Sequence, residues 1–337
     1  MNTNAALILI YHRVAELDCD PQWLAVPPGQ FDEQMAVLAH RWRPIALSEL
    51  ADAVRAGDVP DGAVAVTFDD GYADNWTHAV PILKRYGVPA TIFVTTHGDA
   101  PGRELWWDEL ERLTLGSHSL PRRVTLQVDR ENLSWDLHPG PGKSGRTNWN
   151  VSMPPDTPRR RLFSALHDAL RVARTETRWH VLEQLRAMTG LSPAPRTSHR
   201  LMSNEEIAEA FRSGLIDIGA HTVTHPVLAT LATEDQRWEL AESRRVLAEI
   251  TGGPVSAVSY PYGGRRDYSA TTIEIAESLG FLVGCANHAG CVTRDSNVLA
   301  LPRVLVRDWD GDEFERRIEC AFLNAGRTHG HPASQHV

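Results

Sequence analysis

Short apolar runs of strand length alternate with amphipathic segments, and this alternation constrains the fold more than any other feature of the sequence. Apolar runs occupy residues 6–11, 63–68 and 90–94, and amphipathic segments occupy 31–39 and 76–86. Parallel strands need a crossover connection, which is usually a helix. The pattern therefore predicts parallel strands joined by helices.

The alternation stops between about residues 101 and 199. Residues 139–158 are rich in Gly, Pro, Ser and Asn and are expected to be loop, whereas 159–173 and 176–188 have helical periodicity. We interpret residues 101–199 as a largely helical insertion or lid subdomain. Because Trp106 and Trp107 stand at its start, the insertion is expected to shape substrate specificity.

The alternation then resumes up to the end of the chain. A capping-box pattern, Ser203 followed by Glu206, opens a predicted helix over 203–213. Further strands are expected at 216–220, 257–260, 281–285 and 304–306, and further helices at 234–251, 270–279 and 312–325. Near the N-terminus we expect a strand at 45–47 and a helix capped by Ser48 that runs to Arg55.

About seven strand–helix units around an insertion favour a barrel, complete or incomplete. In such a barrel, function lies at the carboxyl ends of the strands. We expect residues 1–325 to form a single domain that carries the insertion at 101–199, and residues 326–337 to be a flexible tail.

Composition narrows the functional classes. The chain has 337 residues, of which 42% are hydrophobic, and its net charge is -9. An acidic chain without a run of Lys and Arg is a poor nucleic-acid binder. No stretch approaches 18 apolar residues, so no membrane span is expected. Four cysteines without a CxxC pair favour a reducing compartment. The apolar run 5–10 is short for a signal peptide, so we expect a cytoplasmic protein.

Two carboxylates, Asp69 and Asp70, directly follow the apolar run 63–68 and precede Gly71. Adjacent carboxylates raise each other's pKa unless a cation lies beside them. At a strand end they are candidates for catalysis or metal binding. The alternative is structural, with Asp69 in a turn and Asp70 capping the next helix.

Two histidines, His221 and His225, follow the predicted strand at 216–220. Histidines four residues apart can bind one metal ion from a single turn. Together with Asp70 they would give one carboxylate and two imidazoles, a set that leaves room for water and is typical of catalytic zinc sites. Other divalent ions also suit this set.

Two further strand ends carry candidate residues. The segment Tyr260-Pro261-Tyr262-Gly263-Gly264 is expected to be a tight loop whose backbone N–H could hold an oxyanion, and an ordinary turn is the alternative. His12 follows the first strand, where it is a candidate general acid or a structural histidine.

These motifs resemble those of the polysaccharide deacetylase family, also called the NodB-homology group or carbohydrate esterase family 4. Thr67-Phe68-Asp69-Asp70-Gly71 matches its first motif, His221-Thr222-Val223-Thr224-His225 its metal motif, and Tyr260-Pro261-Tyr262-Gly263 part of its third. The resemblance covers residues 6–95 and 200–320. It implies a distorted (β/α)7 barrel and a metal-dependent hydrolase of acylated sugars.

The resemblance also implies roles for single residues. Asp69 would be the general base. Asp70, His221 and His225 would bind a divalent metal, with Zn²⁺ the first candidate, and the backbone N–H of Tyr262 would donate to the oxyanion. Metal-bound water would then be the nucleophile.

The sequence departs from the family pattern in two places. Ser259 stands where the third motif usually has arginine, and Arg303 is a candidate to orient Asp69 instead. The late motif that carries the acid histidine is not evident. The sequence is closest to a subgroup, similar to the poly-N-acetylglucosamine deacetylases, that has this histidine on the first strand. That favours His12 over His288 as the acid.

The sequence therefore predicts a metal-dependent hydrolase that removes an acetyl or formyl group from an amino sugar in a glycan or glycoconjugate. Without an export signal, a nucleotide-linked, lipid-linked or small soluble sugar is expected. The alternatives are a hydrolase of a non-sugar amide or cyclic imide, and a non-catalytic carbohydrate-binding homologue.

Overall fold

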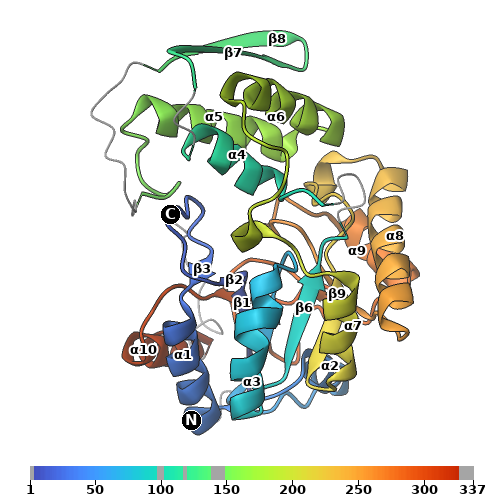
Figure 1. Cartoon of the computed structure of the whole chain (residues 1–337). Coiled ribbons are helices and arrows are strands. Elements are labelled where there is room, and N and C mark those ends of the chain that lie inside the picture. Colours follow the sequence, from blue (N-terminus) through green and yellow to red (C-terminus); the bar gives the residue numbers. More distant parts are fainter. Residues whose placement is uncertain (1–3, 97–101, 117–119, 138–148, 326–337) are drawn as a thin grey trace. The chain divides into compact units, whose positions relative to one another are not determined.

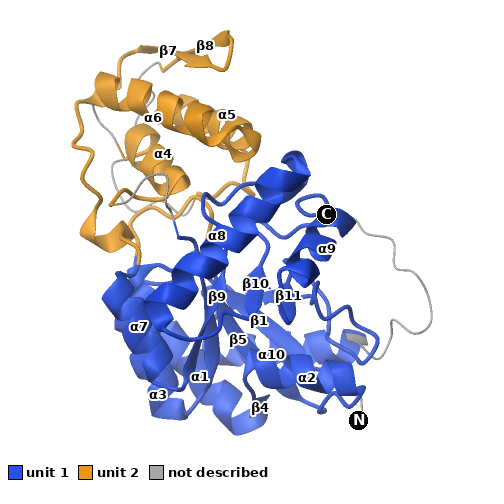
Figure 2. Cartoon of the chain, turned by 90° about the vertical axis from the view of Figure 1, so that its right-hand side faces the viewer, with its two compact units in different colours: residues 1–16, 25–96, 202–337 blue, residues 17–24, 97–201 orange. Residues whose placement is uncertain are grey.

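A computed structural model describes residues 4–96, 102–116, 120–137 and 149–325 of the chain (Figure 1). The chain forms two compact units, which Figure 2 shows in different colours. Unit 1 is built from Met1–Glu16, Ala25–Thr96 and Met202–Val337, and unit 2 from Leu17–Leu24 and His97–Leu201. The predicted tail at 326–337 and the first part of the predicted loop, 139–148, lie outside the described residues.

Unit 1 is built around a parallel sheet. Its strands pair in the order β11 (Val283–Cys285), β10 (Ala257–Ser259), β9 (Ile216–Ala220), β6 (Ala90–Val94), β5 (Ala63–Phe68), β1 (Leu7–Tyr11) and β12 (Val304–Leu305). Every pair along this path is parallel, and β4 (Arg43–Pro44) adds a further parallel pairing to β5. All of these strands therefore present their carboxyl ends at the same edge of the sheet.

The two ends of this strand path approach each other. Leu301, just before β12, forms a parallel bridge with Cys285 of β11, and its carbonyl accepts a hydrogen bond of 2.9 Å from Ala286 N. β12 itself pairs with β1. The sheet is thus a curled parallel half-barrel, and the predicted α/β fold class is confirmed.

The strands are buried on both faces, as expected of a parallel sheet covered by helices. In β1, Leu7, Leu9 and Tyr11 belong to one apolar cluster, whereas Ile8 belongs to another. Helices surround the strands (Figure 2): α1 (Pro28–Arg41), α2 (Leu47–Ala56), α3 (Val80–Tyr86), α7 (Asn204–Arg212), α8 (Thr233–Thr251), α9 (Ala270–Ser278) and α10 (Gly311–Ala325).

Most of these elements lie where the sequence predicts them, and the predicted start of α7 is confirmed. The Ser203 side chain accepts a hydrogen bond from Glu206 N, and the Glu206 carboxylate accepts one from Ser203 N. The strand expected at 45–47 is wrong, because the pairing with β5 occurs at Arg43–Pro44. The predicted Ser48 cap is also wrong. The buried stripe of α2 begins at Leu47, so packing starts the helix earlier.

The helix predicted at 76–86 begins differently from an ordinary α-helix. Residues Asn75–Ala79 form a π-helical turn, and α3 follows it at Val80. Nearby, β2 (Arg13–Val14) continues the chain after β1 and pairs in parallel with β3 (Ala25–Val26).

Unit 2 contains α4 (Trp106–Thr114), an antiparallel hairpin of β7 (Arg123–Val128) and β8 (Glu131–Asp136), α5 (Pro158–Val172) and α6 (Thr175–Thr189). It also includes residues 17–24, which lie outside the predicted insertion at 101–199. Trp106 and Trp107 are buried in this unit, each only 3% exposed, so they serve its core.

Across the described residues, helices of unit 1 and unit 2 alike lack the length and apolar character needed to cross a membrane.

The close contact between β9 and β6 yields a stability prediction. A Cβ atom at Gly219 would lie 2.4 Å from Cδ1 of the buried Phe93 ring. We expect Gly219→Ala to lower the free energy of unfolding by about 1–3 kcal/mol, because overpacking forces the ring to move. Urea denaturation would measure this loss.

Gly29 provides the control, because nothing lies within 4 Å of a Cβ built there in the first turn of α1. Alanine is the better helix former, so Gly29→Ala should leave stability unchanged or raise it by at most about 1 kcal/mol. Equal effects of the two variants would contradict the packing argument.

Candidate active site

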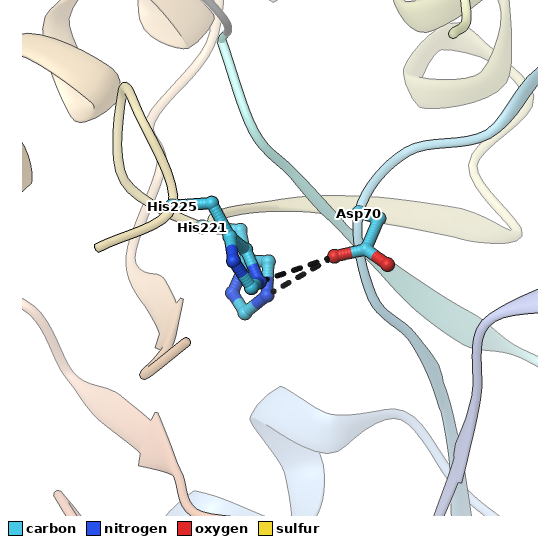
Figure 3. Close-up of side chains that lie close together, drawn as sticks. All are labelled: Asp70, His221 and His225. Atoms are coloured by element: carbon cyan, nitrogen blue, oxygen red, sulfur yellow. Dashed lines mark ion pairs between the residues drawn. The ribbon is translucent and has the colours of Figure 1, made fainter. Parts of the chain in front are cut away.

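The residues singled out in the sequence lie after strands that end at one edge of the sheet. Asp69 and Asp70 follow β5, and His221 and His225 lie after β9. Figure 3 shows the Asp70 carboxylate facing both imidazole rings. Because the strands are parallel, residues more than 150 positions apart in the chain can meet at this edge.

Asp70, His221 and His225 form the single cluster, within the described chain, whose ligand atoms could hold a metal ion; these atoms all lie within 4.8 Å of one another. Nε2 of His221 lies 3.5 Å and Nε2 of His225 3.4 Å from Asp70 Oδ1. Tetrahedral ligands about 2.0–2.1 Å from a shared zinc ion would be separated by about 3.3–3.4 Å. The three residues therefore fit such an ion.

The burial and charge of Asp70 also favour a cation. Its side chain is buried, and Oδ1 has no hydrogen-bond partner within the described residues. Burial alone would raise the pKa of Asp70, but the adjacent His221 and His225 hold that pKa well below its usual range. A buried, ionised oxygen facing two imidazole nitrogens is the arrangement that a divalent ion would complete.

Residues of β10 and α8 form hydrogen bonds with the loop that carries His221 and His225. Nδ1 of His221 donates to the carbonyl of Ser259 at 2.8 Å, which leaves Nε2 as the nitrogen that can bind a metal. The buried carboxylate of Glu239, on α8, accepts hydrogen bonds from the backbone N–H groups of Val223 and Thr224 at 2.7 and 3.0 Å. These contacts fix the loop before any ligand binds.

Asp69 lies in a different environment from its neighbour. Arg303 donates two hydrogen bonds of 2.7 Å to its carboxylate, and Ser259 Oγ donates a third at 3.0 Å. Burial would raise the pKa of Asp69, but the Arg303 guanidinium outweighs it and holds that pKa below the usual value. The expected contact between Arg303 and Asp69 is thus confirmed, and this contact holds the Asp69 carboxylate ionised.

The two candidate acid histidines lie in different surroundings. Burial lowers the pKa of His12, and the charged groups acting on it are Asp70, Asp69, Arg303 and His221. Burial also lowers the pKa of His288, but the charged side chain that acts on this histidine is Arg265. The structure therefore brings His12, rather than His288, to the paired aspartates.

Tyr262 lies after β10, and its ring packs edge-on against His225 with the ring centroids 4.8 Å apart. Its backbone is left-handed, with φ of 62°. The next residue, Gly263, is also left-handed, and a Cβ there would lie 2.5 Å from Asn287 N, so only glycine fits. The loop thus holds the Tyr262 backbone in a fixed, strained conformation.

Comparison with known proteins identifies the family. The sequence profile named polysaccharide deacetylase matches residues 56–138 and 156–284, which together make up more than half of the chain. The chain belongs to the polysaccharide deacetylase family. The family assignment makes the chain a hydrolase of the carbohydrate esterase family 4 type.

Individual relatives align over different lengths. YxkH of Bacillus subtilis (strain 168) is 23% identical over 315 residues, which cover 93% of this chain and 75% of YxkH. The poly-beta-1,6-N-acetyl-D-glucosamine N-deacetylase of Escherichia coli (strain K12) is 32% identical over 89 residues, 26% of this chain and 13% of that protein. The Staphylococcus aureus (strain MSSA476) protein of the same name is 31% identical over 106 residues, 28% of this chain and 37% of that protein.

Solved structures share the fold. IcaB from Ammonifex degensii superposes with a TM-score of 0.57 at 20% identity and covers 94% of this chain and 97% of its own. The deacetylase PplD of Streptococcus pyogenes superposes with a TM-score of 0.55 at 18% identity, covering 93% and 98%.

Several polar residues of this candidate site were not predicted from the sequence. Glu239 lies in the middle of a helix, and nothing in the local sequence marks it as buried. Asp74 and Asn75 follow the paired aspartates closely, and the polar cluster from Asp69 to Asn75 was the one available signal. Both contact the segment that carries His12.

The buried ion pair predicts an asymmetric response to mutation. Arg303→Met should lower the free energy of unfolding by about 3–5 kcal/mol, because it leaves the Asp69 carboxylate buried without its counter-charge. The double variant Arg303→Met/Asp69→Asn removes both charges and should recover much of that loss. Thermal and urea denaturation of the four proteins would measure the cycle. Additive losses would contradict the pairing.

Proposed function

We propose that this polysaccharide deacetylase homologue is a divalent-metal-dependent N-deacylase that removes an acetyl or formyl group from an amino sugar in a glycan or glycoconjugate. The observation that carries the proposal is the convergence of Asp70, His221 and His225 beside Asp69, which Arg303 holds ionised. The names of the Escherichia coli and Staphylococcus aureus relatives support N-acetylglucosamine as the sugar.

Asp70, His221 and His225 would hold the metal ion. A divalent ion in such a site supplies a Lewis acid that acidifies water and polarises the carbonyl of the substrate. Zinc is the first candidate, because one carboxylate and two imidazoles with an open position are typical of catalytic zinc.

The chain's own residues would move the protons. Asp69 accepts a proton from water as the oxygen of that water bonds to the acyl carbon. His12 gives a proton to the sugar nitrogen as the C–N bond breaks, and the products are a carboxylic acid and a free amine. The backbone N–H of Tyr262 is proposed to donate to the carbonyl oxygen as negative charge develops there.

Acid release tests the reaction. Proton NMR would follow acetate and formate during incubation of the zinc-loaded protein with N-acetyl and N-formyl amino sugars that are free, nucleotide-linked or β-1,6-linked oligomers. We expect wild type to release one of the acids and Asp69→Asn to be slower by about 10²–10⁴-fold, the usual contribution of a general base.

Asp69→Asn keeps the shape of the side chain and removes its charge, so a difference in rate reports on the charge. Release at equal rates by the two proteins would contradict the role of Asp69. Sugar binding without release of either acid would favour a non-catalytic carbohydrate-binding protein, and release from non-sugar amides alone would favour the other alternative.

Metal binding can be tested without substrate. After treatment with a chelator, zinc at about 100 times its dissociation constant should raise the free energy of unfolding by about 2.7 kcal/mol. His225→Gln should weaken zinc binding by more than about 100-fold, because loss of even an outer-shell partner costs 10–100-fold. Calorimetric titration and thermal denaturation would measure both effects.

His40→Gln is the control, because His40 is exposed on α1 and its Nδ1 lies 2.8 Å from the carbonyl of Ala36. It should bind zinc as wild type does. Stabilisation by zinc that survives in His225→Gln would contradict the assignment of the site.

A further inference from the structure

One nitrogen of the His12 ring lacks, among the described residues, the hydrogen bond that usually orients a catalytic histidine. Such a ring is normally held by a hydrogen bond from one nitrogen to a carboxylate or carbonyl. Nδ1 of His12 is buried and has no hydrogen-bond partner in the part of the chain that the structure describes. The position of the backbone of residue 12 therefore helps to set the direction of the ring.

That backbone is held by the loop that carries the paired aspartates. The side-chain amide of Asn75 donates a hydrogen bond of 2.7 Å to the carbonyl of His12. Asp74 accepts from the backbone N–H of Val14 at 2.9 Å with Oδ1. Its other oxygen accepts from Arg13 Nε and Nη2 at 3.0 and 2.9 Å. Three consecutive residues after β1 are thus bound by two consecutive side chains.

The side chains that make these contacts are buried. Arg13 is 2% exposed, Asp74 8% and Asn75 0%. The Arg13 guanidinium also stacks on the buried ring of Tyr72, 4.3 Å from its centroid. Buried charge-assisted hydrogen bonds of this kind hold their partners in one geometry more firmly than exposed ones. We refer to Arg13, Asp74 and Asn75 as the clamp.

The local fold explains how the clamp reaches residue 12. Asn75 is the first residue of the π-helical turn, and its carbonyl accepts from Val80 N, five residues later. A π-turn is uncommon and often marks a functional site. It places Asn75 at the widened start of the helix, only five residues after Asp70. One loop therefore supplies Asp69, Asp70 and the groups that hold the His12 backbone.

We infer that Asn75 and the Arg13–Asp74 pair are positioning residues, which fix His12 relative to Asp69 and Asp70 so that it can protonate the leaving nitrogen. This inference rests on the proposed role of His12 as the acid. The clamp residues act through the backbone of residue 12, and their effect should appear only where proton donation to the leaving group limits the rate.

Comparing the rates of substrates with different leaving groups isolates proton donation by His12. An N-acetyl amino sugar needs protonation of its nitrogen, whereas an aryl acetate with a nitrophenolate leaving group does not. The experiment measures kcat and KM of the zinc-loaded full-length protein on both substrates. The ratio of the two kcat values is internal to each variant, so a smaller folded fraction cancels from it.

We expect Asn75→Ala to lower kcat on the amide by about 10- to 100-fold, the cost of a misplacement of about 1 Å, and to change kcat on the aryl acetate by less than threefold. KM should change little on either substrate. Asn75→Asp, which keeps the shape but loses the N–H donor, should behave in the same way. His12→Ala should lower the amide rate alone, and adding Asn75→Ala to it should cause no further loss.

Thr77→Ala is the matched control, because Thr77 is exposed in the same π-turn and its hydroxyl bonds to the carbonyl of Ala73. It should leave the ratio unchanged. Equal losses of both activities in Asn75→Ala and Asn75→Asp, or no loss, would overturn the clamp while His12→Ala still lowers the ratio. If His12→Ala also leaves the ratio unchanged, the acid role in the proposed function fails, and the clamp inference fails with it.

Discussion

The arrangement of this site depends on two adjacent buried carboxylates, whose charges need partners. Asp69 is 3% exposed and Asp70 2%, and burial of each charge costs several kcal/mol unless a partner compensates it. The chain gives the two groups different partners. Asp69 is paired with an arginine, whereas Asp70 faces two imidazoles and has one oxygen without a hydrogen bond among the described residues. Different partners for like groups can separate their roles, which matches the proton acceptor and the metal ligand proposed above.

Asp69 has Arg303 as its counter-charge because the two ends of the strand path approach each other. Arg303 directly precedes β12. The pairing of β12 with β1 brings the Arg303 side chain to Asp69. Its Nε also donates to the carbonyl of Ala286, beyond the end of β11, at 2.8 Å. At Ser259, where the family motif usually has arginine, the short hydroxyl bridges Asp69 and Arg303, and the carbonyl orients His221. The curled sheet thus replaces a side chain missing from β10 with one from the opposite end of the strand path.

Local patterns in the sequence were enough to predict the strand ends and the candidate residues on them. The apolar run 63–68 ends at Asp69, and strand β5 covers the same residues. Pairing partners from distant segments could not be predicted in this way. Glu239 and Asn75 are ordinary polar residues on helical segments, and only the packing of those segments shows which backbone groups they satisfy. Residues 17–24 likewise join unit 2 through tertiary contacts, such as the hydrogen bond from Val151 N to Pro21 O, which no periodicity indicates.

Those missed contacts explain how the site tolerates strained backbone. Asp70, Thr222, His225 and Tyr262 all have positive φ, a conformation that costs side-chain-bearing residues about 1–3 kcal/mol each and persists only where the surroundings enforce it. Glu239 binds the two residues between Thr222 and His225, and Thr222 Oγ1 accepts from His225 N. Shortly after Asp70, Asp74 and Asn75 hydrogen-bond to the backbone of Val14 and His12. Residues outside the proposed catalytic set therefore hold the proposed catalytic residues in place, because a strained loop without such partners would relax and move the candidate metal ligands apart.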